Sequence, residues 1–369
     1  MSRSTNLKVA LVYDRVNKFG GAERVLLALH EIWPEAPLYT SVYNPSAAEW
    51  ANVFDVRMSF LQKLPLPKNK HEYYPFLMGI AFESFNFDEF DVVISVCHEF
   101  SKTIITKPKT LHVCYCLNPV GYLWDSYADY FSSKPTWLKL LTLPLINYLR
   151  WYDQIICQRP DQYIAISKTV QERIKRIYKR DSQVIYPPVG LVRSHLAIQG
   201  ETFYLIISRL VPQKRIDIAV EAFNRLKLPL KIVGTGVEEN RLKSMAKNNI
   251  KFLGNLTDEE LAGYYNSCLA IIIPGEEDFN IVAVEAQSFG KPVIAFGAGG
   301  VTETVIAGKT GVFFSPQTSV ALEQTIKKFK DQKFDENDCK TNARKFSRTR
   351  FHEEFRRMVE RTQNFKKTS

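Results

Sequence analysis

Glu277 and Glu285 are the acidic residues whose surroundings most favour chemistry. The strand-like run Leu269–Ile273 precedes them and a helix is expected from about Ile281, so one carboxylate lies in a loop and the other in the first turns of a helix. Carboxylates in such places accept hydrogen bonds from sugar or ribose hydroxyls, and a helix N-terminus can bind a diphosphate. The alternative is structural, because Asp278 can cap the helix while the glutamates stay solvated.

Two cations, Arg209 and Lys214, follow the predicted strand Tyr204–Ser208 and precede a predicted helix. Ligands of doubly wound α/β sheets bind beyond the carboxyl ends of the strands. Fixed cations at that position suit a pyrophosphate leaving group, because they meet negative charge where it develops. An ordinary basic surface loop is the alternative.

Three further positions carry weaker signals. The pair Gly20 and Gly21 lies between the first strand and a helix, where paired glycines let a backbone approach phosphate or sugar, although a tight turn explains them as well. His98 follows the predicted strand Val92–Val96, so a contact with a donor sugar and a structural histidine are equally good interpretations. The turn at 234–236 receives no role.

Two aromatic stretches admit functional and structural interpretations. Residues 112–131 are dense in Tyr, Trp and Asp, which suits sugar recognition, but such clusters are more often core. Residues 137–151 form the longest apolar run, and Lys139, Pro144 and other polar residues keep it below the roughly 18 residues of a membrane-spanning helix. It can lie in a membrane interface as an amphipathic segment, and a buried helix of the first domain is the favoured alternative.

Short apolar runs that alternate with amphipathic helical stretches position these candidates. Helices are expected at Ala22–Ile32, at Thr169–Tyr178 and around Ile216–Phe223. Continuous apolar strands separated by helices predict parallel sheets covered on both faces. The predicted strands are Leu7–Tyr13, Val92–Val96, Leu111–Tyr115, Gln162–Ile166, Tyr204–Ser208, Leu230–Val233, Leu269–Ile273 and Pro292–Phe296.

A break in this pattern divides the chain into two doubly wound parallel-sheet α/β domains. Two prolines in the stretch 186–190 can continue neither a helix nor a central strand, and the pattern restarts after them. We expect an N-terminal domain over 1–187 and a C-terminal domain over 188–349. The last helix, 350–369, has an apolar face and is expected to pack back on the first domain.

The composition of the 369 residues is that of a soluble globular protein, with 45% hydrophobic and 24% charged residues, which excludes a disordered or collagen-like chain. The net charge of +10 comes largely from residues 327–369 and from a basic cluster on one predicted helix. Neither region carries a nucleic-acid-binding motif, so solvated helix faces are the favoured interpretation and attraction to an anionic membrane stays open. The cluster comprises Arg173, Lys175, Arg176, Lys179 and Arg180.

Six cysteines without metal-ligand spacing are best explained as reduced thiols. The first residues lead into a strand without a signal-peptide core. We therefore expect a cytoplasmic protein, with peripheral contact at the inner face of the membrane as a further expectation.

Several motifs in a fixed order resemble family-4 retaining glycosyltransferases, which have the GT-B fold of two facing Rossmann-like domains. The similarity covers nearly the whole chain and is greatest to bacterial enzymes that extend cell-surface polysaccharides, including mannosyltransferases of O-antigen synthesis. The motifs that carry it are GGAERVL, RPDQYIAIS, VIYPPV, SRLVPQK, EDFNIVAVEA, GKPVIA and the later GG and TG pairs.

The resemblance implies a role for each candidate. Arg209 and Lys214 would bind the nucleoside diphosphate, and Glu285 the nucleotide ribose. Glu277 would bind the donor sugar together with the backbone of Phe279, Asn280 and Ile281, and the first domain would complete the donor site with His98, Gly20 and Gly21. The resemblance implies no cofactor and no catalytic metal, a GDP- or UDP-sugar as the donor substrate, an acceptor-side role for the domain over 1–187 and a donor-binding role for the domain over 188–349.

The chain departs from the family pattern at several positions. Leu117, Asn118 and Gly121 stand where relatives carry a His-Thr pair and an Arg, and Asn280 and Ala283 replace a glycine and a proline. We expect a hexosyltransferase that moves mannose to a lipid-linked glycan and binds no nucleic acid. A degenerate protein that binds the nucleotide sugar without transferring it is the alternative, and a nicotinamide-dependent oxidoreductase is disfavoured because no dinucleotide fingerprint follows the first strand.

Overall fold

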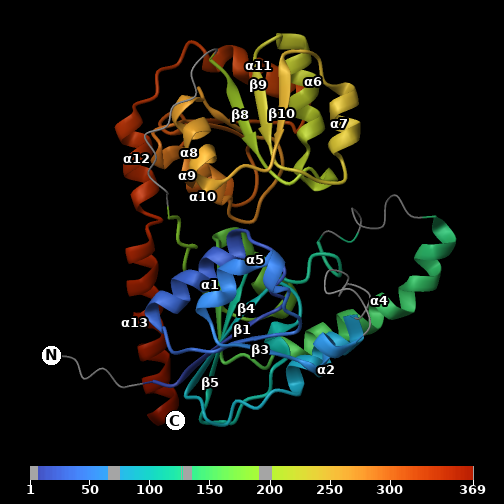
Figure 1. The fold of residues 1–369 in the computed structure, drawn as a ribbon, viewed down its shortest axis with the longest axis vertical. Helices are drawn as coiled ribbons and strands as arrows, with labels where there is room; N and C mark the ends of the chain where they lie inside the picture. The colour runs from blue at the N-terminus through green and yellow to red at the C-terminus, as the bar shows by residue number, and fades with distance from the viewer. Residues whose placement is uncertain (1–6, 65–74, 126, 128–134, 191–201, 369) are drawn as a thin grey trace. The chain divides into compact units, whose positions relative to one another are not determined.

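The computed structural model describes residues 7–64, 75–125, 127, 135–190 and 202–368. The chain divides into two compact units, which are described separately (Figure 1). Unit 1 comprises residues 1–188 and 349–369, and unit 2 comprises residues 189–348.

Unit 1 is built on a parallel sheet with the strand order β3-β2-β1-β4-β5-β6-β7. β1 is paired with β4, a strand that is not its neighbour along the chain, so the connections on either side of this pair run in opposite directions. The strands are β1 (Val9–Tyr13), β2 (Leu38–Thr40), β3 (Val56–Met58), β4 (Val92–Cys97), β5 (Leu111–Cys116), β6 (Gln162–Ala165) and β7 (Ser182–Val184).

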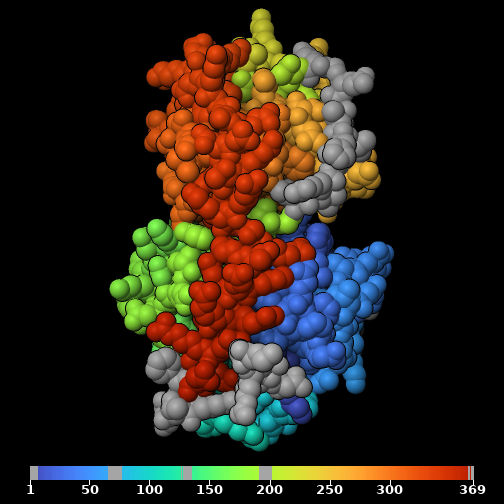
Figure 2. Space-filling model, turned by 90° about the vertical axis from the view of Figure 1, so that its left-hand side faces the viewer, coloured from blue at the N-terminus to red at the C-terminus, as the bar shows by residue number. Residues whose placement is uncertain are grey.

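Helices cover this sheet, and the C-terminal helix is one of them. Figure 2 shows that α13, in red, lies along the surface of unit 1. Its Phe351 and Phe355 contact the buried Tyr115 of β5, at ring-centroid distances of 6.0 and 5.9 Å. The helices are α1 (Gly21–Ile32), α2 (Pro75–Glu83), α4 (Thr136–Ile156), α5 (Lys168–Tyr178) and α13 (Arg348–Thr368).

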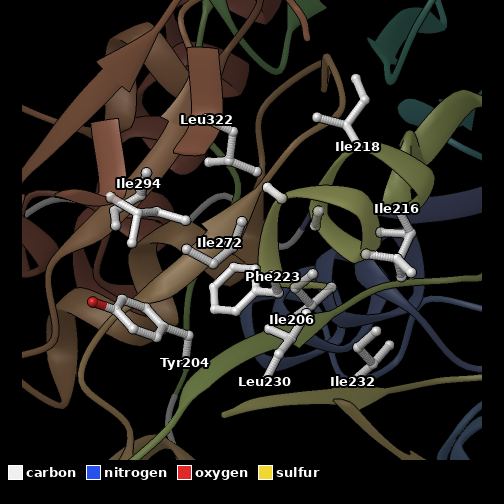
Figure 3. Close-up of a cluster of buried hydrophobic side chains, with 14 of the residues drawn as sticks. Tyr204, Ile206, Ile216, Ile218, Phe223, Leu230, Ile232, Ile272, Ile294 and Leu322 are labelled. Atoms are coloured by element: carbon white, nitrogen blue, oxygen red, sulfur yellow. The ribbon is translucent and has the colours of Figure 1, made fainter. Parts of the chain in front are cut away.

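Unit 2 repeats the same topology with the parallel order β10-β9-β8-β11-β12-β13. Figure 3 shows its core, in which Phe223 of α6 packs among Tyr204, Ile206 and Ile272 of the central strands. The strands are β8 (Tyr204–Ile207), β9 (Leu230–Val233), β10 (Ile250–Gly254), β11 (Ile271–Ile273), β12 (Val293–Phe296) and β13 (Gly311–Phe314). The helices are α6 (Ile216–Leu226), α7 (Glu239–Met245), α8 (Asp258–Ser267), α9 (Ile281–Ser288), α10 (Val301–Thr304), α11 (Ser319–Phe329) and α12 (Glu336–Arg344).

The predicted fold class is confirmed, because both sheets are parallel, both follow the doubly wound order and the C-terminal helix packs on the first unit. The predicted strands at Leu7–Tyr13 and Leu269–Ile273 begin two residues later, at Val9 and Ile271. All six cysteines are buried free thiols. Among the described residues no helix is long and apolar enough to cross a membrane.

The favoured interpretation of residues 137–151 as a buried helix is wrong for one face of that helix. The segment lies within α4, whose Ile146 and Leu149 are buried, whereas Trp137, Leu141 and Trp151 are exposed. The helix is apolar on two sides, and the sequence alone did not indicate that only one of them is covered.

The buried His112 of β5 makes the stability of the protein depend on pH. Its Nε2 lies 2.9 Å from Ser95 Oγ, and burial lowers its pKa to about 3, with Lys366 and Arg159 acting in the same direction. Since the pKa in the unfolded chain is about 6.5, the unfolded state binds a proton that the folded state does not, and stability is lost as the pH falls below about 6.5.

We therefore expect the parent protein to lose about 2 kcal/mol more stability than a His112→Gln variant between about pH 7.5 and about pH 5. Urea unfolding of both proteins at the two pH values measures the difference. His98→Gln, which changes an exposed histidine of the same unit, should keep the pH dependence of the parent. If the stability of the parent and of His112→Gln changed equally between the two pH values, His112 would not be the source of this pH dependence.

Candidate active site

The predicted donor-binding residues of unit 2 lie at the point where its strand order reverses. β8 and β11 are neighbours in the sheet, and Arg209 and Lys214 follow β8 while Glu277 follows β11. Ligands of doubly wound sheets bind at this position, because the connections diverge there and leave the strand ends uncovered. The topology therefore brings together residues that are more than sixty positions apart in the sequence.

Lys214 and Glu277 are in direct contact. Lys214 Nζ donates a hydrogen bond to Glu277 Oε2 over 2.5 Å, and both side chains are mostly but not completely buried. Lys214 ends a short 3-10 helix, Pro212–Lys214, and its backbone lies so close to Gly275 that a Cβ there would be 2.9 Å from the Lys214 carbonyl oxygen. Arg209 lies in the same connection with an exposed side chain.

The helix that follows Glu277 is capped by Asn280, and the alternative of an Asp278 cap is therefore wrong. Asn280 adopts a left-handed backbone with φ of 71°, and its Oδ1 accepts the backbone N–H of Ala283 over 2.8 Å. Asparagine tolerates this conformation better than most residues, so it can occupy the place where relatives are expected to carry glycine. The first N–H groups of α9 have no acceptor within the helix, and Asn280 takes one of them.

Glu285 is buried in α9 and is held by a residue that the sequence did not single out. Tyr265 of α8 donates its hydroxyl to Glu285 Oε2 over 2.7 Å, and its ring stacks on Phe289. The side chain of Phe279 is also buried, at 5.6 Å from the ring of Phe346, which leaves its backbone as the part that can contact a ligand. Helical periodicity could have placed Tyr265 on the inner face of α8, but not opposite Glu285.

Glycines let the neighbouring connections pack against this loop. Gly300 N donates to the Glu277 carbonyl oxygen over 2.7 Å, and a Cβ at Gly300 would lie 2.3 Å from the carbonyl oxygen of Asp278. Gly234, in the turn that received no role, has φ of 120° and a Cβ there would lie 2.0 Å from the Ser208 carbonyl oxygen. The connections after β8, β9, β11 and β12 therefore converge through backbone contacts that side chains would prevent.

In unit 1 the predicted residue His98 lies at the corresponding reversal, between β1 and β4. Its side chain is exposed, and its backbone is fixed by the buried Asp14, which follows β1. The carboxylate of Asp14 accepts four backbone N–H groups at 2.7 to 3.0 Å, those of His98, Glu99, Phe100 and Ser101. Sequence reasoning missed Asp14, although the rule that pointed to His98 applies equally to it.

The glycine pair of unit 1 starts a helix. Gly20 is the N-cap of α1, and Gly21 is the first residue of the helix. In the first turn of the same helix, the buried Glu23 accepts the hydroxyl of Tyr13 over 2.6 Å. Burial and the neighbouring carboxylate raise the pKa of Tyr13. The exposed Gly21 and the helix N-terminus remain available to a ligand.

Most of the described aromatic segment 112–125 is structural. Trp124 donates to the buried Asp153 over 2.8 Å, and Asp153 in turn pairs with the buried Lys102. Asp125 pairs with Arg176 at 2.6 Å and with Arg173 at 3.2 Å, so part of the basic cluster on α5 fastens this segment. Residues 126 and 128–131 lie outside the described residues.

The described part of the chain contains no group of three or more His, Cys, Asp or Glu side chains arranged to hold a metal ion. Metal independence of the reaction therefore stays a prediction.

The part of the chain that carries this site is similar to known proteins. Residues 191–346 match the model of the family described as glycosyl transferases group 1. An uncharacterized glycosyltransferase of Methanocaldococcus jannaschii is 30% identical over 183 residues, which cover 48% of this chain and 52% of the relative, so this match spans about half the length of that protein.

Two mannosyltransferases are also similar. The alpha-1,3/1,6-mannosyltransferase ALG2 of Mus musculus is 26% identical over 84% of this chain and 85% of its own. The O-antigen chain mannosyltransferase C of Escherichia coli is 25% identical over 57% of this chain and 58% of its own.

Solved structures share the fold at lower identity. Sucrose-phosphate synthase from Thermosynechococcus elongatus has a TM-score of 0.72 at 18% identity, over 96% of this chain and 99% of its own. HepE of Anabaena, solved in complex with UDP, has a TM-score of 0.68 at 16% identity, over 96% of this chain and 100% of its own. The fold of this chain is therefore GT-B.

Asp14→Asn should destabilise the protein by about 3 kcal/mol, because the amide nitrogen replaces one carboxylate oxygen and leaves buried N–H groups without an acceptor. Urea unfolding measures the loss. Asp88→Asn, which changes an exposed aspartate of the same unit, should stay within about 0.5 kcal/mol of the parent. Equal losses in the two variants would show that the second carboxylate oxygen of Asp14 and its hydrogen bonds contribute nothing to stability.

Proposed function

Because residues 191–346 match the model of the glycosyl transferases group 1 family, we propose that this chain transfers a hexose from a nucleoside diphosphate sugar to a glycan with retention of configuration. The observation that carries the proposal is the cluster at the ends of β8 and β11. A lysine and a carboxylate are in contact there, a helix begins a few residues after the carboxylate, and Arg209 lies in the same connection as the lysine. These are the groups that a diphosphate attached to a sugar requires.

Arg209 and Lys214 stabilise the leaving diphosphate in this proposal. Lys214 exchanges its contact with Glu277 for a phosphate oxygen when the donor binds, so that the cation meets the charge that develops as the bond to the sugar breaks. The exposed Arg209 adds a second, bidentate donor to the same group. The acceptor hydroxyl attacks the anomeric carbon on the face that the diphosphate leaves, and its proton goes to a phosphate oxygen.

The carboxylates bind the two sugars of the donor. Glu277, freed from Lys214, accepts hydrogen bonds from hydroxyls of the transferred hexose, together with the backbone around Asn280. Glu285 accepts from the hydroxyls of the nucleotide ribose, and its hydrogen bond from Tyr265 holds the carboxylate in place for that contact. Residues 188–349 are thus the donor domain, and the first domain supplies His98, Gly20 and Gly21 to the donor and the surface for the acceptor.

Mannose is the proposed sugar, and a lipid-linked glycan at the inner face of the membrane is the proposed acceptor. The similarity to two mannosyltransferases supports the sugar, and the O-antigen enzyme among them supports a role in cell-surface polysaccharide synthesis. GDP-mannose is the first donor to test. UDP-sugars are the second, because a solved protein of the same fold binds UDP.

A thermal-shift panel of GDP, UDP, ADP, their common sugars and NAD(P)H, without metal, tests the donor. A ligand at about 100 times its Kd adds about 2.7 kcal/mol of stability and should raise Tm by several degrees. We expect a shift with GDP and GDP-mannose and none with NAD(P)H. A shift with a UDP-sugar alone would change the donor, and a shift with NAD(P)H alone would overturn the proposal.

Lys214→Ala should lower kcat for sugar transfer by about 10²–10³, because it removes a cation that stabilises the leaving group. Transfer of labelled sugar to a lipid extract measures the rate. Lys243→Ala is the matched control, since it also removes a lysine of unit 2 that pairs with a glutamate, Glu239, and should keep the parent rate. A folded Lys214→Ala protein with the parent rate would exclude this role.

A double variant that carries both Lys214→Ala and Glu277→Gln distinguishes a catalytic role of Lys214 from a role in neutralising Glu277. If Lys214 acts on the diphosphate, its removal lowers the rate in the Glu277→Gln background as well. If Lys214 only neutralises Glu277, the double variant transfers sugar as fast as Glu277→Gln alone. A parent protein that shows a nucleotide shift but transfers no sugar would instead favour the degenerate binding protein to which the residues Leu117, Asn118 and Gly121 point.

A further inference from the structure

α4 (Thr136–Ile156) is apolar on two opposite faces. One face packs on the core of unit 1 through Ile146, Leu149 and Ile156, and through Asp153, which pairs with Lys102 at 2.8 Å. Its inner half lies beside α2, where Tyr152 donates to Glu83 over 3.1 Å, and its outer half extends away from the sheet (Figure 1). The core therefore accounts for only one of the two apolar faces.

The other face is a continuous exposed stripe. Its members recur at alternating intervals of four and three residues, which places them on one side of a helix. The exposed fraction is 66% for Trp137, 70% for Leu141 and 58% for Trp151, and Leu140 beside them is equally exposed. The stripe consists of Trp137, Leu141, Pro144, Tyr148, Trp151 and Ile155.

The residue types in the stripe match the boundary between lipid headgroups and acyl chains. Trp and Tyr are enriched at that boundary, because an apolar ring and a polar atom are satisfied there together. The stripe contains no charged residue, and an apolar face of this kind suits a helix that lies in the plane of the surface. At 1.5 Å per residue the 21 residues of α4 are about 31 Å long.

The net charge of this part of the chain favours a lipid bilayer over a second copy of the chain as the partner that covers the stripe. Residues 101–180, which include α4 and the basic helix α5, hold 13 Lys and Arg against 5 Asp and Glu, and the excess of cations remains when the pairs of Lys102 with Asp153 and of Arg173 and Arg176 with Asp125 are set aside. Two copies paired through α4 would both carry this net positive charge. An anionic bilayer attracts it instead, by about 1 kcal/mol for each cation near the surface.

We propose that α4 lies in the surface of an anionic bilayer, with the stripe inserted to about 5–10 Å. The contact does not depend on sugar transfer, so it can be tested in the absence of any nucleotide. It holds the whole chain at the surface from which a lipid-linked acceptor would be taken.

Cosedimentation of the full chain with vesicles tests the proposal. We expect binding to mixed phosphatidylcholine–phosphatidylglycerol vesicles, weaker binding to pure phosphatidylcholine, and a blue shift of tryptophan fluorescence on binding. A variant with Trp137→Ser, Leu141→Ser and Trp151→Ser should bind the mixed vesicles about 100-fold more weakly, because three inserted side chains no longer leave water. Val53→Ser, Met58→Ser and Val320→Ser, at exposed apolar positions elsewhere, form the matched control and should bind as the parent does.

Two results would overturn the proposal. The first is equal vesicle binding by the parent and the stripe variant, or no binding by either. The second is a parent protein that sediments as a dimer without vesicles and becomes a monomer in the stripe variant, which would assign the stripe to a second copy. Unchanged Tm of the variant confirms that it is folded, and nucleotide-induced shifts in both proteins report on the donor site separately.

Discussion

The pairing of strands that are not consecutive in the chain is the constraint on which the site depends. β8 pairs with β11 and β1 pairs with β4, and at each pair the chain turns away in opposite directions. The ends of both strands are therefore left uncovered, so the residues that follow them can be polar and can contact a ligand. In unit 2 this places Lys214 beside Glu277, and in unit 1 it places Asp14 beneath the connection that holds His98.

The two units use buried carboxylates in different ways at these positions. Asp14 is fully engaged by backbone N–H groups, which makes it a structural anion that fixes a connection. Glu285 accepts a tyrosine hydroxyl instead, from the fifth residue of α9, the helix that follows Glu277. Asp14 cannot accept hydroxyls of a sugar, because four backbone N–H groups occupy both of its oxygens, and it is therefore part of the scaffold rather than a binding residue.

The sequence predicted the parts of the fold that depend on continuous burial. The central strands are runs of Val, Ile and Leu, and their ends were located to within two residues. The strands that it missed are β2, β3, β7, β10 and β13, which lie at or near the sheet edges and are short or carry polar residues such as Arg57 and Gln183. Site residues were found by their place after a strand, whereas partners such as Tyr265 depend on packing between distant segments.

α4 shows where periodicity alone cannot distinguish two kinds of burial. A helix that is apolar on both sides has the sequence pattern of a core helix. Which side is exposed can be known only from the positions of the neighbouring helices and strands. The buried side of α4 is fixed by Ile146, Leu149 and the Asp153–Lys102 pair, and a fully buried ion pair tolerates little rotation of the helix. The opposite side is therefore held outward, and its tryptophans remain in water unless a second apolar phase covers them.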